Sequence, residues 1–168
     1  MSATFCPQCG TRLESRQKSG RERQCCPECG YVEYRNPAVG VAVVLRDESG
    51  RVLLGRRATG DYTGLWCIPC GYVEWDEDVR EAAVREFEEE TGVRVELGEV
   101  LAVHSNFHNR EKQTVGIWFE GKEAGGRLHP VDGEFTELGW FAPDEPPALA
   151  FPTDALVLEQ LAAASTGG

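Results

Sequence analysis

Apolar residues gather in short runs after residue 37, and these runs have the lengths of strands. Residues 38–47 (AVGVAVVLRD) are typical of a buried strand, and residues 51–57 (RVLLGRR) are typical of a second one. The polar segment between them predicts a turn, so we expect the two strands to pair as a hairpin. Later runs predict three more strands, near residues 93–104, 113–120 and 138–142.

Two other segments carry the start and stop signals of helices. The acidic stretch 76–78 begins the first helix, which we expect to run to about Thr91 and to end at Gly92. Residues 153–164 have helical spacing, with Thr153 as the expected N-cap. Because strands are interspersed with two helices, the chain is predicted to fold as a layered α/β protein.

The first thirty residues have almost no hydrophobic periodicity and instead carry two C-x-x-C knuckles. Sixteen residues separate the knuckles, and each is followed by a glycine, Gly10 or Gly30, that lets the turn fold back. Four thiolates at this spacing make a closed tetrahedral zinc site, and a segment this small does not fold without one. The alternative, two turns with incidental cysteines, would leave the segment without a core. We therefore expect a zinc ribbon at residues 1–35, a second domain at residues 36–168, and a structural zinc ion on Cys6, Cys9, Cys26 and Cys29.

The other three cysteines are assigned no metal. Cys25 is interpreted as a spare thiol, because only Cys26 has the x-x spacing to Cys29. Cys67 and Cys70 form a third C-x-x-C, for which a redox pair or a second metal site is the alternative. No second knuckle completes that site, so we interpret both as small residues that shape a loop.

Basic residues lie between the two knuckles, at Arg12, Arg16, Lys18, Arg21 and Arg23. Zinc ribbons often contact nucleic acid, but Glu14 and Glu22 dilute this patch, and a solvated loop is the favoured interpretation. The net charge of −11 also repels nucleic acid and anionic membrane surfaces. Apolar residues make up 41% of the chain. The sequence shows no secretory signal pattern and no apolar run long enough to span a bilayer. We therefore expect a cytoplasmic protein that binds neither membranes nor nucleic acid.

The first predicted helix carries the most informative chemistry. Glu86, Glu89 and Glu90 stand at positions i, i+3 and i+4, so they share one helix face. Three like charges on one face repel one another unless a hard divalent cation with oxygen ligands neutralises them, and Mg²⁺ fits that description best. Arg85 stands four residues before Glu89 and can orient its carboxylate. The alternative is a solvated acidic helix, which describes Glu88 well.

This segment resembles the Nudix box, G-x5-E-x7-R-E-U-x-E-E-x-G-U, where U is a bulky apolar residue. Phe87 and Val93 occupy the two apolar positions, whereas Cys70 and Asp76 stand where glycines are usual, which affects substrate fit more than chemistry. All seven fixed positions match, namely Gly71, Glu77, Arg85, Glu86, Glu89, Glu90 and Gly92. The resemblance implies a Nudix α/β/α sandwich with a mixed sheet, preceded here by the small zinc ribbon.

The resemblance also implies roles for individual residues. Glu86, Glu89 and Glu90 would bind Mg²⁺ or Mn²⁺, Arg85 would hold a glutamate in place, and Glu77 would support the loop or the metal shell. The metal would bridge a diphosphate and activate the water that cuts it. In this family the general base is either a box glutamate or a later loop carboxylate. The later candidates are Glu134 and Glu137, and each also fits a solvated loop.

The substrate class follows from the same resemblance. A ribbon followed by this box is similar to the NADH pyrophosphatase group and to a group of FAD and ADP-ribose pyrophosphatases. The array of prolines that marks the first group is absent here, because no proline lies between Pro69 and Pro130. We therefore expect a small nucleoside diphosphate linked to another moiety, such as FAD, ADP-ribose or NAD(H). Candidate substrate-binding residues are Trp66, Gly71, His104 and Asn106, although Trp66 equally fits core packing and His104 a strand edge.

A second function from a different class stays open at this point. A catalytically weak Nudix protein could sense a nucleotide or associate with RNA and use its ribbon to contact a partner. Such proteins usually lose box carboxylates, and this chain keeps all of them. Homodimers are frequent in such families, so the resemblance also leaves a homodimer open.

Overall fold

The computed structural model describes residues 3–109 and 111–165, and its contacts divide the chain into two compact units, Met1–Pro37 and Ala38–Gly168. In the first unit, β1 (Glu14–Lys18) and β2 (Arg21–Cys25) form an antiparallel hairpin. The chain after the second knuckle joins this hairpin through an antiparallel bridge between Cys25 and Val32.

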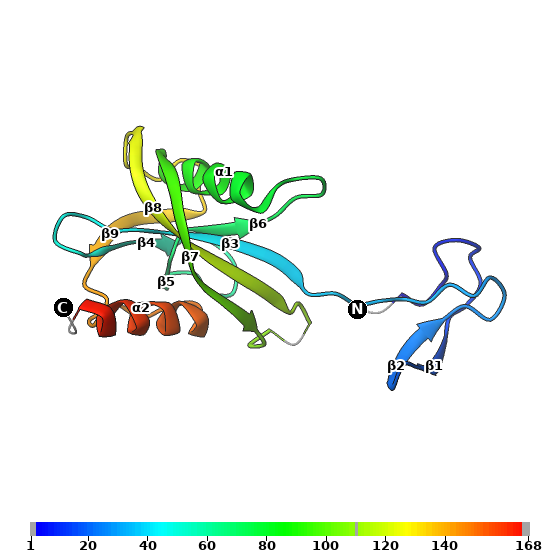
Figure 1. The fold of residues 1–168 in the computed structure, drawn as a ribbon. Helices are drawn as coiled ribbons and strands as arrows, with labels where there is room; N and C mark the ends of the chain where they lie inside the picture. Colours follow the sequence, from blue (N-terminus) through cyan, green and yellow to red (C-terminus); the bar gives the residue numbers. More distant parts are fainter. Residues whose placement is uncertain (1–2, 110, 166–168) are drawn as a thin grey trace. The chain divides into compact units, whose positions relative to one another are not determined.

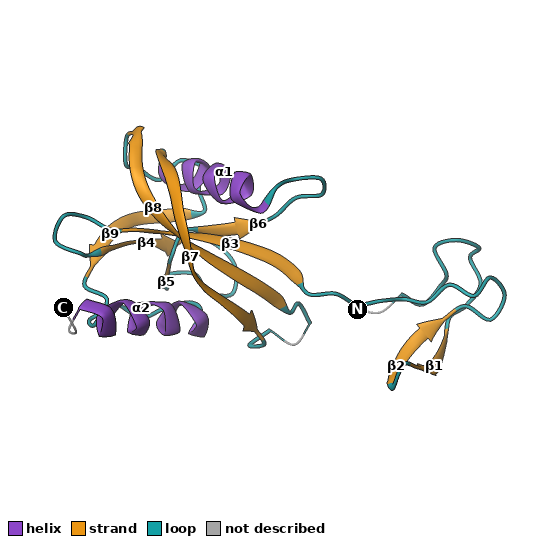
Figure 2. Cartoon of the chain, viewed as in Figure 1, coloured by secondary structure: helices purple, strands orange, loops and turns teal. Residues whose placement is uncertain are grey.

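The second unit is a sandwich in which α1 and α2 lie on opposite sides of the strands (Figure 1 and Figure 2). One sheet has the strand order β6-β3-β8-β7, and a smaller sheet has the order β5-β4-β9. Strands β3 and β8 are parallel and their other neighbours are antiparallel, so the sheet is mixed, as the resemblance implied. The strands and helices of this unit are β3 (Ala38–Leu45), β4 (Val52–Arg57), β5 (Trp66–Cys67), β6 (Cys70–Tyr72), α1 (Val79–Thr91), β7 (Val93–Asn106), β8 (Thr114–Gly126), β9 (Phe135–Phe141) and α2 (Pro152–Ser165).

Helix α1 begins and ends where its sequence signals predict. The Asp78 side chain accepts a hydrogen bond from the Arg80 backbone N–H, which satisfies one of the free donors of the first turn. Gly92 adopts a left-handed backbone with φ of 71° and donates its N–H to the Glu88 carbonyl. The predicted boundaries of this helix are confirmed.

Strands β3 and β4 occupy the predicted positions but do not form the predicted hairpin. Beyond the turn at residues 47–51, one bridge joins Arg46 to Val52, and the two strands then enter different sheets. Both strands are apolar on both faces, so each must be buried between two layers of side chains. Strand β3 pairs with β6 and β8, and β4 pairs with β5 and β9. The Asp47 carboxylate stabilises the turn by accepting hydrogen bonds from the Ser49 and Arg51 backbone N–H groups.

Alternate residues of β3 supply the cores on the two faces of the sheet. On one face the α1 residues Ala82, Ala83 and Phe87 pack against Val41, Val43, Leu45 and Phe119. On the other face the α2 residues Val157, Leu158 and Leu161 pack against Ala42, Val44, Leu54 and Trp118. The apolar residues of α1 thus fix its orientation, and with it the direction in which each box glutamate points.

Helix α2 begins one residue earlier than predicted, and Thr153 is not its N-cap. Pro152 is the first helical residue, a position that suits a fixed φ and a missing N–H. Thr153 lies inside the helix, and its hydroxyl is buried without a hydrogen-bond partner within the described residues. The next residue, Asp154, ties the helix to the sheet by accepting from the Ile68 N–H at 3.0 Å and the Trp118 indole N–H at 3.1 Å.

Asp154 also makes stability depend on pH. Burial raises the pKa of this carboxyl from 3.8 to about 7 despite the two donors. In the unfolded chain the group loses its proton near pH 4, whereas in the folded protein it keeps that proton until near pH 7. Its contribution to the free energy of unfolding therefore falls as the pH rises from about 4 to about 7, by on the order of 4 kcal/mol.

We expect the Asp154→Asn variant to lose this part of the pH dependence. Urea unfolding followed at several pH values between 4 and 7 measures it, and the difference between variant and parent isolates Asp154 because every other carboxyl is common to both. An unchanged pH dependence in the variant would show that the buried carboxyl does not titrate in this range.

Candidate active site

Arg85 on α1 connects the carboxylates of the box. Its Nε and one terminal nitrogen donate to the two Glu77 carboxylate oxygens at 2.7 and 2.8 Å, a bidentate pair. The other terminal nitrogen lies 2.9 Å from Glu86 Oε1 and 3.1 Å from Glu89 Oε2. The guanidinium also donates to the Tyr72 carbonyl on β6 at 3.3 Å. One side chain therefore joins the loop before the helix, the helix face and the sheet.

Glu77 is the support of the loop that leads into α1. The hydrogen bonds from Arg85 lower the pKa of this carboxyl to about 2, so it stays ionised. Glu77 Oε2 also accepts from the Glu74 backbone N–H at 3.0 Å. This arrangement supports the positioning role that the sequence resemblance implied.

Glu86 lies directly on Gly71 of β6. A methyl group added at Gly71 would overlap the Glu86 carboxyl group, so only glycine leaves room for that side chain against the strand. The side chain of Glu86 is 20% exposed, and its partial burial raises the pKa of the carboxyl in spite of Arg85 nearby. Gly71 therefore shapes the place where the Glu86 carboxylate sits.

Glu90 is the most unusual residue of the site. It is 1% exposed, and neither carboxylate oxygen has a hydrogen-bond partner within the described residues. Burial raises its pKa well above the usual range, and the nearby Cys70, Glu134 and Asp132 raise it further. A buried carboxylate without a donor is costly, so an unpaired group of this kind indicates a ligand that the protein is built to bind.

The donors of this site fit a hard divalent cation. Glu86 and Glu90, one helical turn apart, both face β6, and their oxygens are the ligand type that Mg²⁺ and Mn²⁺ prefer. Within the described ranges, however, the three box glutamates do not gather within 4.8 Å, as the ribbon cysteines do. Glu89 is held outward by Arg85, with 54% of its side chain exposed. The structure thus brings Glu86 and Glu90 to one place and leaves Glu89 beside it.

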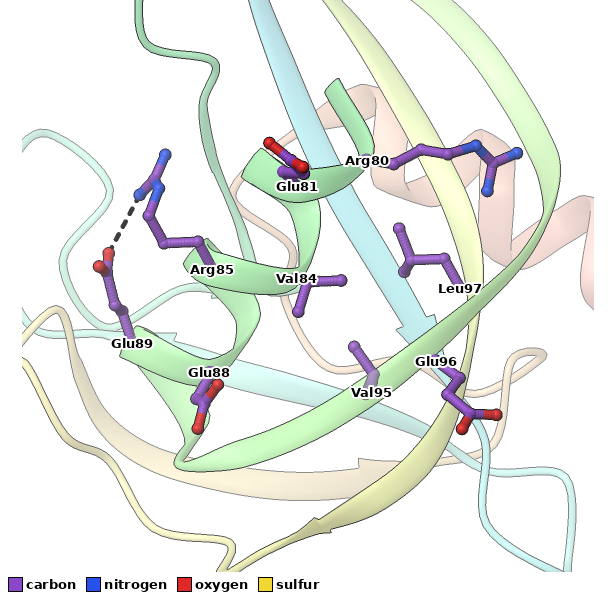
Figure 3. A pocket seen from close by; sticks show the side chains of 9 residues that line it. All are labelled: Arg80, Glu81, Val84, Arg85, Glu88, Glu89, Val95, Glu96 and Leu97. Atoms are coloured by element: carbon purple, nitrogen blue, oxygen red, sulfur yellow. Dashed lines mark hydrogen bonds and ion pairs between the residues drawn. The ribbon is translucent and has the colours of Figure 1, made fainter. Parts of the chain in front are cut away.

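An open groove of about 820 Å³ runs along the outer side of α1, between the helix and β7. In Figure 3, Arg85 and Glu89 lie at one side of this groove and are joined by their ion pair. The nine lining residues are Arg80, Glu81, Val84, Arg85, Glu88, Glu89, Val95, Glu96 and Leu97. Glu86 and Glu90 are not among them, so the groove lies on a different side of the helix from the buried carboxylates.

Three predicted substrate-binding residues lie on the other face of the sheet. Trp66 packs in the α2-side core with its ring 4.8 Å from that of Phe141. His104 stacks edge-on against Trp118 at 5.6 Å, and its Nε2 is buried without a partner in the described part of the chain. Asn106 follows two positions along the same strand face and contacts His108. The register therefore separates these side chains from Gly71 and the box glutamates.

The two later carboxylates differ in their surroundings. Glu137, on β9, lies opposite Arg56 and forms an ion pair with it at 3.8 Å, with 58% of its side chain exposed. Glu134 lies in the preceding loop, and its charge raises the pKa of both Glu86 and Glu90. Glu134 is thus the carboxylate that lies near the buried pair.

Sequence reasoning missed an aromatic and basic cluster near this loop. The Arg57 guanidinium lies 5.5 Å from the Phe151 ring, and the charge of the Glu134 carboxylate acts on it. The Tyr62 and Phe151 rings pack in a T-shaped, edge-to-face arrangement with their centres 5.4 Å apart. The one sequence signal is Arg57, a basic residue at the end of a predicted strand. The rest of the cluster could not be predicted, because Phe151 is far from Arg57 in the chain.

The ribbon cysteines form the second candidate metal centre. The Sγ atoms of Cys6, Cys9, Cys26 and Cys29 all lie within 4.8 Å of one another. Gly10 and Gly30 have φ of 75° and 77°, the left-handed backbone that folds each knuckle back. Cys25 faces away, with its thiol donating to the Arg23 carbonyl. Four thiolates in one cluster fit a tetrahedral zinc ion.

Replacing Gly71 by alanine is expected to lower the hydrolytic activity that the Nudix-box resemblance implies by at least about tenfold while the fold is kept, because the methyl group displaces the Glu86 carboxylate. Steady-state rates and the thermal midpoint of the variant measure both effects. Gly40→Ala is the matched control on the neighbouring strand, since its methyl group would meet only backbone at 3.6 Å or more. Equal rates in the two variants would argue against the position of Glu86.

Comparison with known proteins adds to these observations. The NUDIX domain model matches residues 36–161, and the Nudix N-terminal model matches residues 4–35. The chain is 33% identical over 153 residues to the NAD-capped RNA hydrolase NudC of Chromobacterium violaceum, covering 90% of this chain and 54% of that protein. It is 30% identical over 132 residues to the ADP-ribose pyrophosphatase of Methanocaldococcus jannaschii, covering 78% of this chain and 77% of that protein.

The fold has a solved counterpart over nearly the whole chain. A NUDIX hydrolase from Nitrosomonas europaea matches with a TM-score of 0.84 and 32% identity, covering 98% of this chain and 94% of that one. The chain spans about half the length of the NudC relatives that it matches. Neither helix of the described ranges is long and apolar enough to cross a membrane.

Proposed function

Because the chain belongs to the Nudix family, with the NUDIX domain matched over residues 36–161, we propose that it hydrolyses the diphosphate bond of a nucleoside diphosphate linked to another moiety. The single observation that carries this proposal is the buried, unpaired carboxylate of Glu90 beside Glu86. The family uses divalent metals, and the carboxylate donors favour Mg²⁺ or Mn²⁺ here. We assign zinc to the four cysteines as a structural ion.

Each box residue has a separate part in this proposal. Glu86 and Glu90 would hold the cation, and Glu89 would join them or bind a second one from its outward position. When bound, the cation neutralises the diphosphate charge and lowers the pKa of an attacking water. Arg85 positions the carboxylates through its contacts with Glu77, Glu86 and Glu89, and it keeps Glu77 ionised.

The proton of the attacking water needs an acceptor. We assign this role to Glu134 in preference to Glu137, because Glu134 acts electrostatically on Glu86 and Glu90 whereas Glu137 is paired with Arg56. The water oxygen forms a bond to one phosphorus, the bridging P–O bond breaks, and its electron pair leaves with the other phosphate. The products are two monophosphates.

The substrate class is supported by two kinds of observation. The relatives are named for NAD-capped RNA and ADP-ribose, and both substrates contain a nucleoside diphosphate linked to another group. Near the buried carboxylates, Arg57 and the Phe151 ring provide a cation and an aromatic surface. FAD, ADP-ribose and NAD(H) combine a diphosphate with planar rings or sugars and fit these features. Trp66, His104 and Asn106 stay candidates for a more distant contact on the other face.

A substrate panel tests this function. FAD, NADH, NAD, ADP-ribose, dinucleoside polyphosphates and nucleoside triphosphates are incubated with Mg²⁺ or Mn²⁺, and the products are separated by chromatography. We expect the linked diphosphates to be cleaved with kcat/KM at least tenfold above the triphosphates, and Glu89→Gln to be impaired. Cleavage that does not need a divalent metal, or a preference for triphosphates, would argue against the proposal.

A further inference from the structure

The hairpin of the ribbon unit has a fixed register that sorts its charged residues. Ser19 and Gly20, between the two strands, have φ of 51° and 74°, which defines a two-residue turn with both central residues left-handed. This turn places Lys18 directly opposite Arg21, and Arg16 directly opposite Arg23. Residues opposite one another in an antiparallel pair share a face, and residues two apart on one strand share it too. All four cations therefore lie on one face of the hairpin.

Of the two acidic residues in this segment, Glu14 and Glu22, only Glu14 lies on the face with the four cations. Glu22 pairs with Gln17 on the opposite face, where its carboxylate accepts from the Ser15 hydroxyl. Glu14 is on the basic face and pairs with Arg16 at 2.9 Å. The face thus keeps a surplus of three positive charges over five residues of strand. Like charges directly opposite one another destabilise a hairpin, so the register costs stability unless an anion binds there.

An aromatic ring completes this surface. The Arg23 guanidinium lies 4.6 Å from the centre of the Tyr34 ring, and Tyr34 is 62% exposed. The Arg23 Nε is buried and has no hydrogen-bond partner within the described residues. Cations that follow a strand beside an exposed ring are the combination that binds single-stranded nucleic acid, through its phosphates and the stacking of a base.

We propose that the face formed by Arg16, Lys18, Arg21, Arg23 and Tyr34, here named the basic hairpin face, binds a single strand of nucleic acid. The charge complementarity of this face outweighs the net charge of −11, because screening limits the repulsion to about 8 Å at physiological salt. This changes the interpretation of the segment as a solvated loop. The interaction is independent of diphosphate cleavage, since none of these residues belongs to the box.

The test measures binding of a fluorescent 12-nucleotide RNA with a 5′-hydroxyl end, and of DNA of the same sequence, to the zinc-loaded full chain. Such a probe has no diphosphate bond, so failure here is distinct from failure of the proposed hydrolysis. We expect anisotropy to rise with protein for RNA, DNA or both. With three phosphates contacted, raising salt from 50 to 200 mM should weaken binding by roughly twentyfold.

Two sets of variants locate the surface. Lys18→Gln/Arg21→Gln should weaken binding by about tenfold, whereas Arg94→Gln/Lys122→Gln, which removes two exposed charges from the other unit, should leave it unchanged. Tyr34→Ala should weaken it by about tenfold and Tyr34→Phe should preserve it. Equal zinc content in all variants shows that the ribbon is intact, and hydrolysis of a small nucleotide should be unaffected.

Three results would overturn the proposal. One is the absence of binding to both probes at 50 mM salt. Another is an equal loss of affinity in the hairpin double variant and its charge-matched control. The third is binding to vesicles containing phosphatidylserine, dependent on the hairpin cations, without binding to either oligonucleotide, which would assign the face to anionic lipid.

Discussion

Replacing Glu90 by glutamine is expected to lower metal-dependent hydrolysis by at least about a thousandfold, because it removes one charged ligand from the buried carboxylate pair. The fold should not suffer. Glu90 is buried without a partner and its pKa is raised by burial, so the metal-free parent protein carries the cost of an unpaired acid. A neutral amide has no charge to bury, and the metal-free variant should unfold at the same temperature as the parent or above it.

The combination of lost activity and retained stability separates a ligand from a structural residue. Rates are measured across a titration of Mg²⁺ and Mn²⁺, and unfolding is measured in the presence of a chelator. Glu88→Gln is the matched control, because Glu88 stands two residues away on the exposed side of the same helix and lines the outer groove. A Glu90→Gln variant that keeps its rate, or one that loses rate only because it unfolds, would contradict the assignment of Glu90.

Removing zinc is expected to unfold the ribbon and leave the second unit folded. Structural zinc contributes roughly 10–16 kcal/mol of binding free energy, and the ribbon's hydrophobic cluster is small, with Leu13, Cys6 and Cys26 as its buried members. Cys26→Ser should therefore lose zinc and hydrogen-exchange protection throughout residues 4–35. The second unit has its own core on both faces of the sheet and should keep its protection.

The neighbouring cysteine provides a close control for that experiment. Cys25→Ser changes the adjacent thiol, which donates to the Arg23 carbonyl and lies outside the four-sulfur cluster. It should keep one zinc per chain, measured by mass spectrometry of the intact protein. Loss of zinc from Cys25→Ser but not from Cys26→Ser would reverse the ligand assignment.

The box could be predicted from sequence because it is local. The i, i+4 spacing of Glu86 and Glu90 and the caps at Asp78 and Gly92 depend on positions within one helix, and the structure has both. What the spacing could not give is the direction of each carboxylate. Glu89 shares the helix face by spacing, yet Arg85 holds it outward, and the apolar side of α1 sends Glu90 into the interior.

The errors come from contacts between distant segments. The sequence predicts that residues 38–47 and 51–57 pair as a hairpin, but β3 and β4 lie in different sheets, where each pairs with strands from distant parts of the chain. His104 and Asn106 lie on the α2 face through their register with β8, which no local pattern encodes. The same is true of the ribbon, where the register of β1 and β2 moves Glu22 away from the cations that it accompanies in sequence.

Hydrolysis in water enriched in ¹⁸O tests the central claim most directly. The linked nucleotide that the protein cleaves fastest is hydrolysed in a single-turnover reaction with Mg²⁺ or Mn²⁺. The masses of both phosphate-bearing products are then measured by mass spectrometry. Attack of water on phosphorus predicts one ¹⁸O atom in one of the two monophosphates and none in the other, with no product when the metal is chelated. Products without ¹⁸O in either phosphate, or the same products formed without a metal, would contradict metal-dependent cleavage of the diphosphate bond.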